Sequence, residues 1–267
     1  MAGVKRNADG KDVTPPTRFG GMFEQFRDEL DEHYDRKERI VKASRDVTAA
    51  SKKIIFSLQR VRSLNKDLPS PIQREVDLRL AAIRTSLEPV AGDLQGINRY
   101  RYHNQMRCLE ELVEALSFMH YIRTQTLISP AQAQAAVPVP TVLLNEHDYL
   151  YGIFDLFGEM MRFATVAAGR TGSLGGVVQP ADGGGDKTHV DGGQGRSMLD
   201  DIQNMSAEFE CFPEAPGKAY RMKMEEMRNS VKKVEALGYG LAIRRSERPK
   251  GWVPDLDVGP APEVEQD

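Results

Sequence analysis

The sequence has no run of about 18 apolar residues, the length that a helix needs to cross a bilayer, so we expect no membrane span. It has only two cysteines, Cys108 and Cys211, too few for a disulfide framework. Both lie in apolar-periodic segments, which predicts reduced core thiols in an intracellular protein. Charge of one sign is not in excess, because 36 Lys and Arg face 39 Asp and Glu. Nucleic acid would therefore need a local basic patch or a partner's surface.

Motifs of common enzyme classes are also missing. No GxxxxGK[ST] segment is present, which excludes a Walker-type phosphate-binding loop. The five histidines lack the spacing of metal ligands, and no local signature supports Ser-His-Asp or Cys-His catalysis. We also find no internal repeat and no alternating pattern strong enough to predict a β-sheet.

Apolar residues at helical spacing are present along most of the chain. The pattern predicts an all-α fold, an elongated bundle of about seven helices. The predicted helices cover 22–64, 70–94, 98–123, a short piece from Ser129, 145–168, 197–211 and 215–245. The first would be about 60 Å long and needs neighbours along its whole length, in a long bundle or an oligomer.

The composition divides the chain into one helical domain and flexible segments. We expect a single domain over 21–248, with a disordered tail at 1–20 and an acidic, Pro-rich disordered tail at 249–267. Within the domain, the glycine density of 169–195 predicts a flexible insert.

Two of the predicted helices carry acids on their apolar sides. On the helical projection of 98–123, Glu111 falls inside the apolar sector and Glu114 lies at its edge. On 145–168, Asp155 and Glu159 are four residues apart and share one stripe with Asp148. A carboxylate that points into a core costs several kcal/mol unless it is paired, protonated or bound to a metal. If the two helices pack with these acids facing, Mg²⁺ or Mn²⁺ would suit the oxygen ligands.

Other interpretations of these acids remain open. A di-iron centre is rejected, because it wants Glu-x-x-His on two helices and neither helix has histidine in that slot. Glutamates three apart on a helix are usually a solvated face, and we expect Glu110 and Asp148 to be such solvated acids. Arg107 and Arg162 could pair with the acids, which would make the cluster a structural salt-bridge network.

Several segments resemble the translin-associated factor X branch of the translin family. They include EELVEALSFMHYIRTQTLIS at 110–129, HDYLYGIFDLFGEMMRFA at 147–164 and KVEALGYGLAIRRSERPK at 233–250. The resemblance covers 22–128 and 145–248, nearly all of the expected domain. The family's catalytic acids lie in E-x-x-E-A-[VL]-S-F and D-L-x-G-E. By motif, these acids correspond to Glu111, Glu114, Asp155 and Glu159.

The resemblance implies a helical subunit that packs with translin into a hollow hetero-octamer. It also implies a Mg²⁺-dependent endoribonuclease acting on single-stranded or nicked RNA, with the four acids as metal ligands or water-orienting groups. The implied substrates are the passenger strand of a small interfering RNA or fragments from transfer-RNA processing. Arg107 and Arg162 are weaker candidates for holding phosphate.

The leading hypothesis is therefore the catalytic subunit of a translin-containing RNA nuclease in the cytoplasm, with a nuclear location left open. A second hypothesis is a non-catalytic structural partner that stabilises translin and helps it bind RNA or DNA. A third is a helical adaptor unconnected with nucleic acid.

Overall fold

The computed structural model describes residues 18–171, 174, 197–213 and 217–247. The expected tails, apart from residues 18–20, lie outside the described residues. So does the expected Gly-rich insert beyond Thr171, apart from Leu174. Within them the chain forms eight α-helices and no strand, which confirms the all-α prediction. The helices are α1 (Gly20–Leu58), α2 (Ser70–Leu87), α3 (Asn98–Arg101), α4 (Cys108–Thr124), α5 (Pro130–Ala136), α6 (Glu146–Thr171), α7 (Met198–Glu210) and α8 (Lys218–Glu247).

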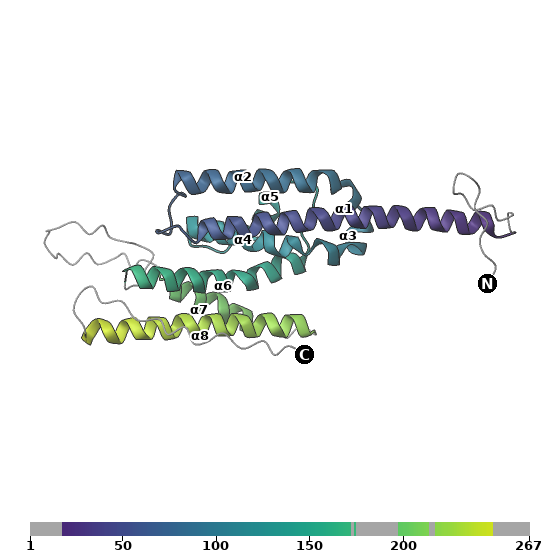
Figure 1. Cartoon of the computed structure of the whole chain (residues 1–267). Helices are drawn as coiled ribbons and strands as arrows, with labels where there is room; N and C mark the ends of the chain where they lie inside the picture. Colours follow the sequence, from purple (N-terminus) through teal and green to yellow (C-terminus); the bar gives the residue numbers. More distant parts are fainter. Residues whose placement is uncertain (1–17, 172–173, 175–196, 214–216, 248–267) are drawn as a thin grey trace, which may run out of the picture.

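The long helices lie side by side in an elongated bundle (Figure 1). α1 packs against α2 and α4, α4 packs against α6, and α6 packs against α8. The N-terminal part of α1 projects beyond the end of the bundle (Figure 1). Its first fully buried residue is Ile40, 20 positions after the helix begins at Gly20. The bundle is thus built on the second half of α1.

Three predicted helices differ clearly from the structure. The helix predicted over 22–64 ends at Leu58. The predicted helix 98–123 is broken into α3, a 3₁₀ turn η3 (His103–Met106) and α4. At the break Tyr102 is buried, and its hydroxyl lies 3.0 Å from His33 Nδ1 of α1. This tertiary contact fixes the turn. The predicted helix 70–94 ends at Leu87, because Pro89 cannot continue the hydrogen-bond ladder, and two 3₁₀ turns follow, η1 (Glu88–Val90) and η2 (Gly92–Leu94).

One continuous hydrophobic core joins all of the long helices. Cys108 is buried in it, but Cys211 is exposed. The expectation of two core thiols is therefore wrong for Cys211, which lies one residue past the end of α7. None of the described helices is long and apolar enough to span a membrane.

Candidate active site

The close packing of α4 against α6 brings the four candidate acids into one region. A methyl group added at Gly152 of α6 would lie only 2.7 Å from the Glu110 carbonyl oxygen and from Val113 Cβ. The absence of a side chain at this glycine therefore lets the two backbones approach closely. Glu111 and Glu114 follow on α4, and Asp155 and Glu159 follow on α6.

The carboxyl groups are near enough to alter one another's ionisation. Burial raises the pKa of Glu114 to about 9, with further raising contributions from the charges of Asp155, Glu111 and Glu159. Burial also raises the pKa of Glu111, and so do the charges of Asp155 and Glu159, while Lys52 lowers it. The charges of both acids of α6 therefore raise the pKa of both glutamates of α4, as expected when all four belong to one site.

Cationic and amide groups hold three of the four acids. Lys223 of α8 forms an ion pair with Asp155. Lys52 Nζ of α1 lies 3.8 Å from Glu111 Oε2. Glu159 accepts hydrogen bonds from Arg162 Nη1 at 2.9 Å and from Gln59 Nε2 at 2.7 Å.

Glu114 is the exception among the four acids. It is only 8% exposed, and its carboxyl group has no hydrogen-bond or ion-pair partner among the residues that the structure describes. A buried, unpaired carboxyl group favours the protonated form, which accounts for the direction of its pKa shift.

The burial of the acids differs from the helical projection. Glu114, expected at the edge of the apolar sector, is buried, whereas the side chain of Glu111 is 23% exposed. The reason is that α1 and α6 both pack on α4, so a position at the edge of one helix face is closed by a second neighbour. The expectation that Glu110 and Asp148 are solvated is also wrong, because both are buried.

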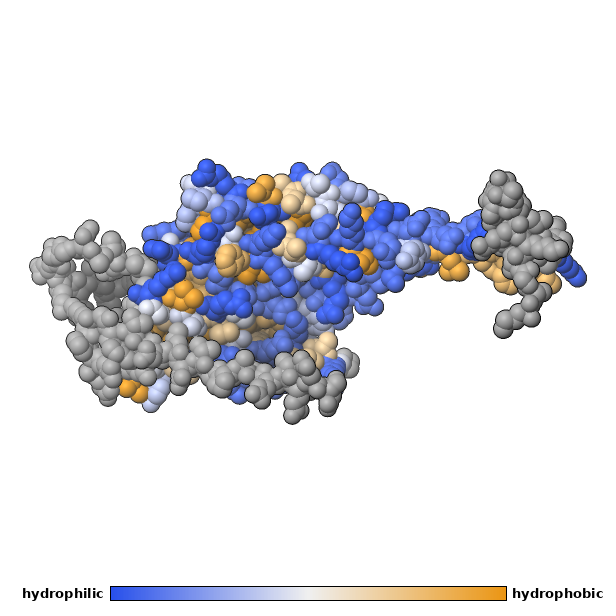
Figure 2. Space-filling view, viewed as in Figure 1, coloured by the Kyte–Doolittle hydropathy of each residue, from blue (hydrophilic) through white to orange (hydrophobic). Residues whose placement is uncertain are grey.

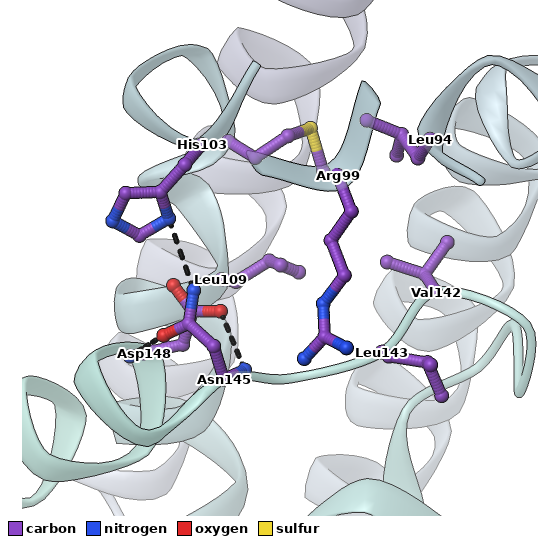
Figure 3. Close-up of a pocket in the computed structure, with 9 residues that line it drawn as sticks. Leu94, Arg99, His103, Leu109, Val142, Leu143, Asn145 and Asp148 are labelled. Atoms are coloured by element: carbon purple, nitrogen blue, oxygen red, sulfur yellow. Dashed lines mark hydrogen bonds between the residues drawn. The ribbon is translucent and has the colours of Figure 1, made fainter. Parts of the chain in front are cut away.

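Asp148 caps the start of α6 instead. It accepts a hydrogen bond from the Asn145 backbone N–H at 3.0 Å and donates its own N–H to Asn145 Oδ1 at 2.8 Å. Figure 3 shows this pair at a cavity of about 20 Å³, room for about one water molecule. Arg99 Nε and Asp148 Oδ1 are both buried there without a partner. Both residues line the cavity and Asp148 belongs to the hydrogen-bonded start of α6, so we assign this cavity a structural role.

The two candidate arginines lie in different surroundings. Arg162 borders the acids through its bond to Glu159. Arg107 Nε instead lies 3.3 Å from Glu110 Oε1, outside the four-acid cluster. The structure thus brings Arg162 to the candidate site and leaves Arg107 beside it. Both side chains are mostly exposed.

The acids suit a divalent cation by chemistry, although their side chains are not arranged as a metal cage. Throughout the described part of the chain, no three Asp, Glu, His or Cys side chains are gathered closely enough to hold a metal ion. Lys223, Lys52 and Arg162 occupy positions where a cation would compete. Gln59 Oε1 is buried without a partner, on the amide that donates to Glu159. An unpaired oxygen on a residue that contacts Glu159 suits a hydrated hard cation, which prefers oxygen ligands.

Comparison with known proteins decides the family. A family model described as Translin family matches residues 35–245. The chain belongs to the translin family. It is 30% identical to Translin-associated protein X of Rattus norvegicus over 272 residues, which cover 93% of this chain and 87% of the relative. It is 27% identical to the Translin-associated protein X homolog of Schizosaccharomyces pombe over 228 residues, covering 85% and 89%.

A solved structure described as "Crystal structure of apo-NeC3PO" shares the fold of this translin-family chain. Its TM-score is 0.57 at 17% sequence identity, and the match covers 82% of this chain and 96% of that one. At this identity the likeness establishes the fold alone. It confirms the predicted translin-like helical architecture.

Sequence reasoning missed three residues that contact the acids: Lys52, Gln59 and Lys223. Lys52 and Gln59 are seven residues apart and so lie on one face of α1, a signal that could have been read once α1 was known to flank the acids. Lys223 stands between Met222 and Met224, and nothing in its local pattern indicates a partner on α6.

Proposed function

We propose that this chain is the catalytic subunit of a Mg²⁺-dependent endoribonuclease that assembles with translin and cleaves single-stranded or nicked RNA. The observation that carries the proposal is the single electrostatic site formed by Glu111, Glu114, Asp155 and Glu159. The names of its relatives, Translin-associated protein X, support translin as the partner. The assembly that we propose is a hetero-octamer. The proposed substrates are small-RNA passenger strands or transfer-RNA processing fragments.

The four acids would hold Mg²⁺, or Mn²⁺ in its place. A divalent cation bound by carboxylates lowers the pKa of water and stabilises negative charge on a phosphodiester. Gln59 fixes the orientation of Glu159 through a hydrogen bond from Nε2. Lys223 compensates the negative charge of Asp155, and Lys52 compensates that of Glu111, when no cation is bound. Arg162, whose side chain is 64% exposed, would contact an RNA phosphate.

The test removes one carboxylate charge from each helix in the assembled complex. We expect Glu111→Gln and Asp155→Asn each to reduce Mg²⁺-dependent cleavage of labelled single-stranded RNA by about 100-fold or more, because a loss of a few kcal/mol at the transition state has this effect. Glu110→Gln is the matched control, since Glu110 is also buried on α4 but pairs with Arg107. Full cleavage by both site variants would refute the proposal.

The ion pairs also favour a second candidate, the non-catalytic structural partner. If Lys223, Lys52 and Arg162 exist to neutralise the acids, the cluster is a set of salt bridges that joins α1 to α4 and α8 to α6. In that case the Glu111 and Asp155 variants would keep any cleavage of the complex but lower its thermal stability. Measuring both properties on the same preparations separates the two functions.

A further inference from the structure

The C-terminal end of α1 and the residues that follow it are strongly basic in a chain whose net charge is −3. From Val47 to Lys66 there is no Asp or Glu, while Lys52, Lys53, Arg60, Arg62 and Lys66 are present. This is the local basic patch that a nucleic-acid-binding protein without an overall positive charge requires.

An exposed aromatic side chain stands in the middle of this basic segment. Phe56 is 71% exposed, although it lies in a helix whose other apolar residues nearby, Ile54, Ile55 and Leu58, are buried. Between positions 52 and 60 the exposed residues are Lys52, Lys53, Phe56 and Arg60. The exposed residues nearest to Phe56 in this segment are therefore cationic.

This aromatic residue is next to the candidate active site. Lys52, one helical turn before Phe56, lies 3.8 Å from Glu111. Gln59, three residues after Phe56, donates to Glu159. Because residues three and four apart share a helix face, Phe56 lies on the part of α1 that borders the acids. One turn of helix rises only about 5.4 Å, so Phe56 is close to Lys52 along the helix axis.

We propose that Phe56 is a stacking platform for an unpaired base of single-stranded RNA, with Lys52 and Lys53 contacting the adjacent phosphates. An aromatic ring among basic side chains is the general means of binding single strands without sequence preference. Lys53 forms no ion pair with any residue that the structure describes, so its charge is available to phosphate. Arg60 is held by Glu75 of α2 and contributes less. The choice of RNA rests on the proposed function.

A protein partner is the competing occupant of this surface. Such a partner would need an apolar area larger than one ring, because isolated exposed apolar side chains are common on soluble proteins. The charged neighbours of Phe56 do not supply that area. The two occupants also respond differently to unpaired and paired RNA, since only unpaired bases can stack on a side chain.

The experiment measures RNA binding by the assembled complex in EDTA, with a labelled oligoadenylate of about 10 nucleotides. We expect Phe56→Leu to raise the Kd about tenfold and Phe56→Trp to preserve it. Lys53→Gln should raise the Kd and make binding less dependent on salt. Tyr239→Leu is the control, because Tyr239 is equally exposed but lies 16 residues, about 24 Å, along α8 from Lys223.

A fluorescent reporter tests the stacking directly. The chain has a single tryptophan, Trp252, so the double variant Phe56→Trp, Trp252→Phe places the only indole at the proposed platform. Single-stranded RNA should quench its emission and duplex RNA should not. Unchanged affinity in Phe56→Leu, an unquenched reporter, or no RNA binding by the wild-type complex would overturn the inference. Loss of assembly with translin in Phe56→Leu would assign the surface to a protein partner instead.

The inference and the proposed function fail in different ways. Removing acids should abolish cleavage at unchanged RNA affinity, whereas Phe56→Leu should raise KM about tenfold and leave kcat at saturating RNA nearly unchanged. If the acid variants keep full activity while Phe56→Leu still loses affinity, only the nuclease proposal fails. If the reverse is found, only the stacking platform fails.

Discussion

At the scale of single residues, the carboxyl group of Glu114 is costly for the folded chain to ionise, because it is buried. It is a carboxyl group that is 8% exposed and unpaired among the described residues, with a pKa of about 9. A folded protein keeps such a group only at the expense of stability. Active sites are where such expense is usually found, which agrees with the proposed role of the cluster.

The raised pKa gives a pH-dependent prediction for Glu114→Gln. The folded-state pKa lies above the usual 4.5, so the native state binds this proton more tightly than the unfolded state does. The wild-type free energy of unfolding should therefore fall, relative to the variant, as pH rises from about 4.5 to about 9. The variant should be more stable by an amount on the order of 3 kcal/mol at pH 7 and by almost nothing near pH 4.

Urea unfolding of the full chain in EDTA at several pH values measures this difference. Glu225→Gln on α8 is the control, because Glu225 is exposed and should give a flat difference across the same range. A Glu114→Gln effect that is constant with pH would mean that the carboxyl group is already ionised, and thus paired, in the folded chain.

At the scale of helices, the contact of α4 with α6 positions all four acids. The two helices meet where Gly152 faces Glu110 and Val113. Gly158, two turns further along α6, has no atom within 4 Å of the position where a Cβ would be. The two glycines of one helix therefore serve different purposes, and only the first sets the distance between the pairs of acids.

Substituting each glycine by alanine separates these purposes. We expect Gly152→Ala to lower the free energy of unfolding by about 1–3 kcal/mol, because the methyl group overpacks the contact. Gly158→Ala should be neutral or stabilise by up to about 1 kcal/mol, since alanine favours a helix and meets no neighbour. Thermal and urea unfolding of both variants checks this, and equal effects would contradict the close contact.

At the scale of the whole molecule, the projecting part of α1 exposes an apolar stripe. Phe23, Phe26, Leu30 and Tyr34 are all exposed and recur every three or four residues, on one face of the helix. Apolar side chains gather under this projecting helix in the space-filling view (Figure 2). A helix that makes few contacts in its own subunit gains stability from neighbours, so we expect the proposed translin partner to cover this stripe.

The double variant Phe23→Ser, Phe26→Ser tests that expectation. It should weaken co-assembly with translin by at least about tenfold, because each buried aromatic side chain contributes roughly 1.5–3 kcal/mol. Leu78→Ser is the control, since Leu78 is similarly exposed but lies on α2. Size-exclusion chromatography with light scattering gives the assembly state, and unchanged assembly of the double variant would exclude the stripe as a contact.

Local pattern was enough to predict the all-α class and most helix positions, because helical periodicity depends on residues within a few turns of one another. The family motifs also indicated which four acids to compare. The local sequence pattern gave wrong predictions where burial depends on a second helix packed against the first. It placed Glu114 at an edge and Asp148 in solvent, and it predicted one helix across Tyr102. In each case burial depends on elements distant in the sequence.

The sequence by itself therefore determined the helices and the family, since helices follow from the local spacing of apolar residues and the family follows from short motifs. Only the tertiary structure decided how the acids are surrounded. Lys223 is 68 residues from Asp155, and Gln59 is 100 residues from Glu159. These contacts exist because α8 and α1 pack on either side of the α4–α6 pair. The packing of whole helices, and not any local pattern, makes Glu114 the acid of the four that has no ion-pair partner among the described residues.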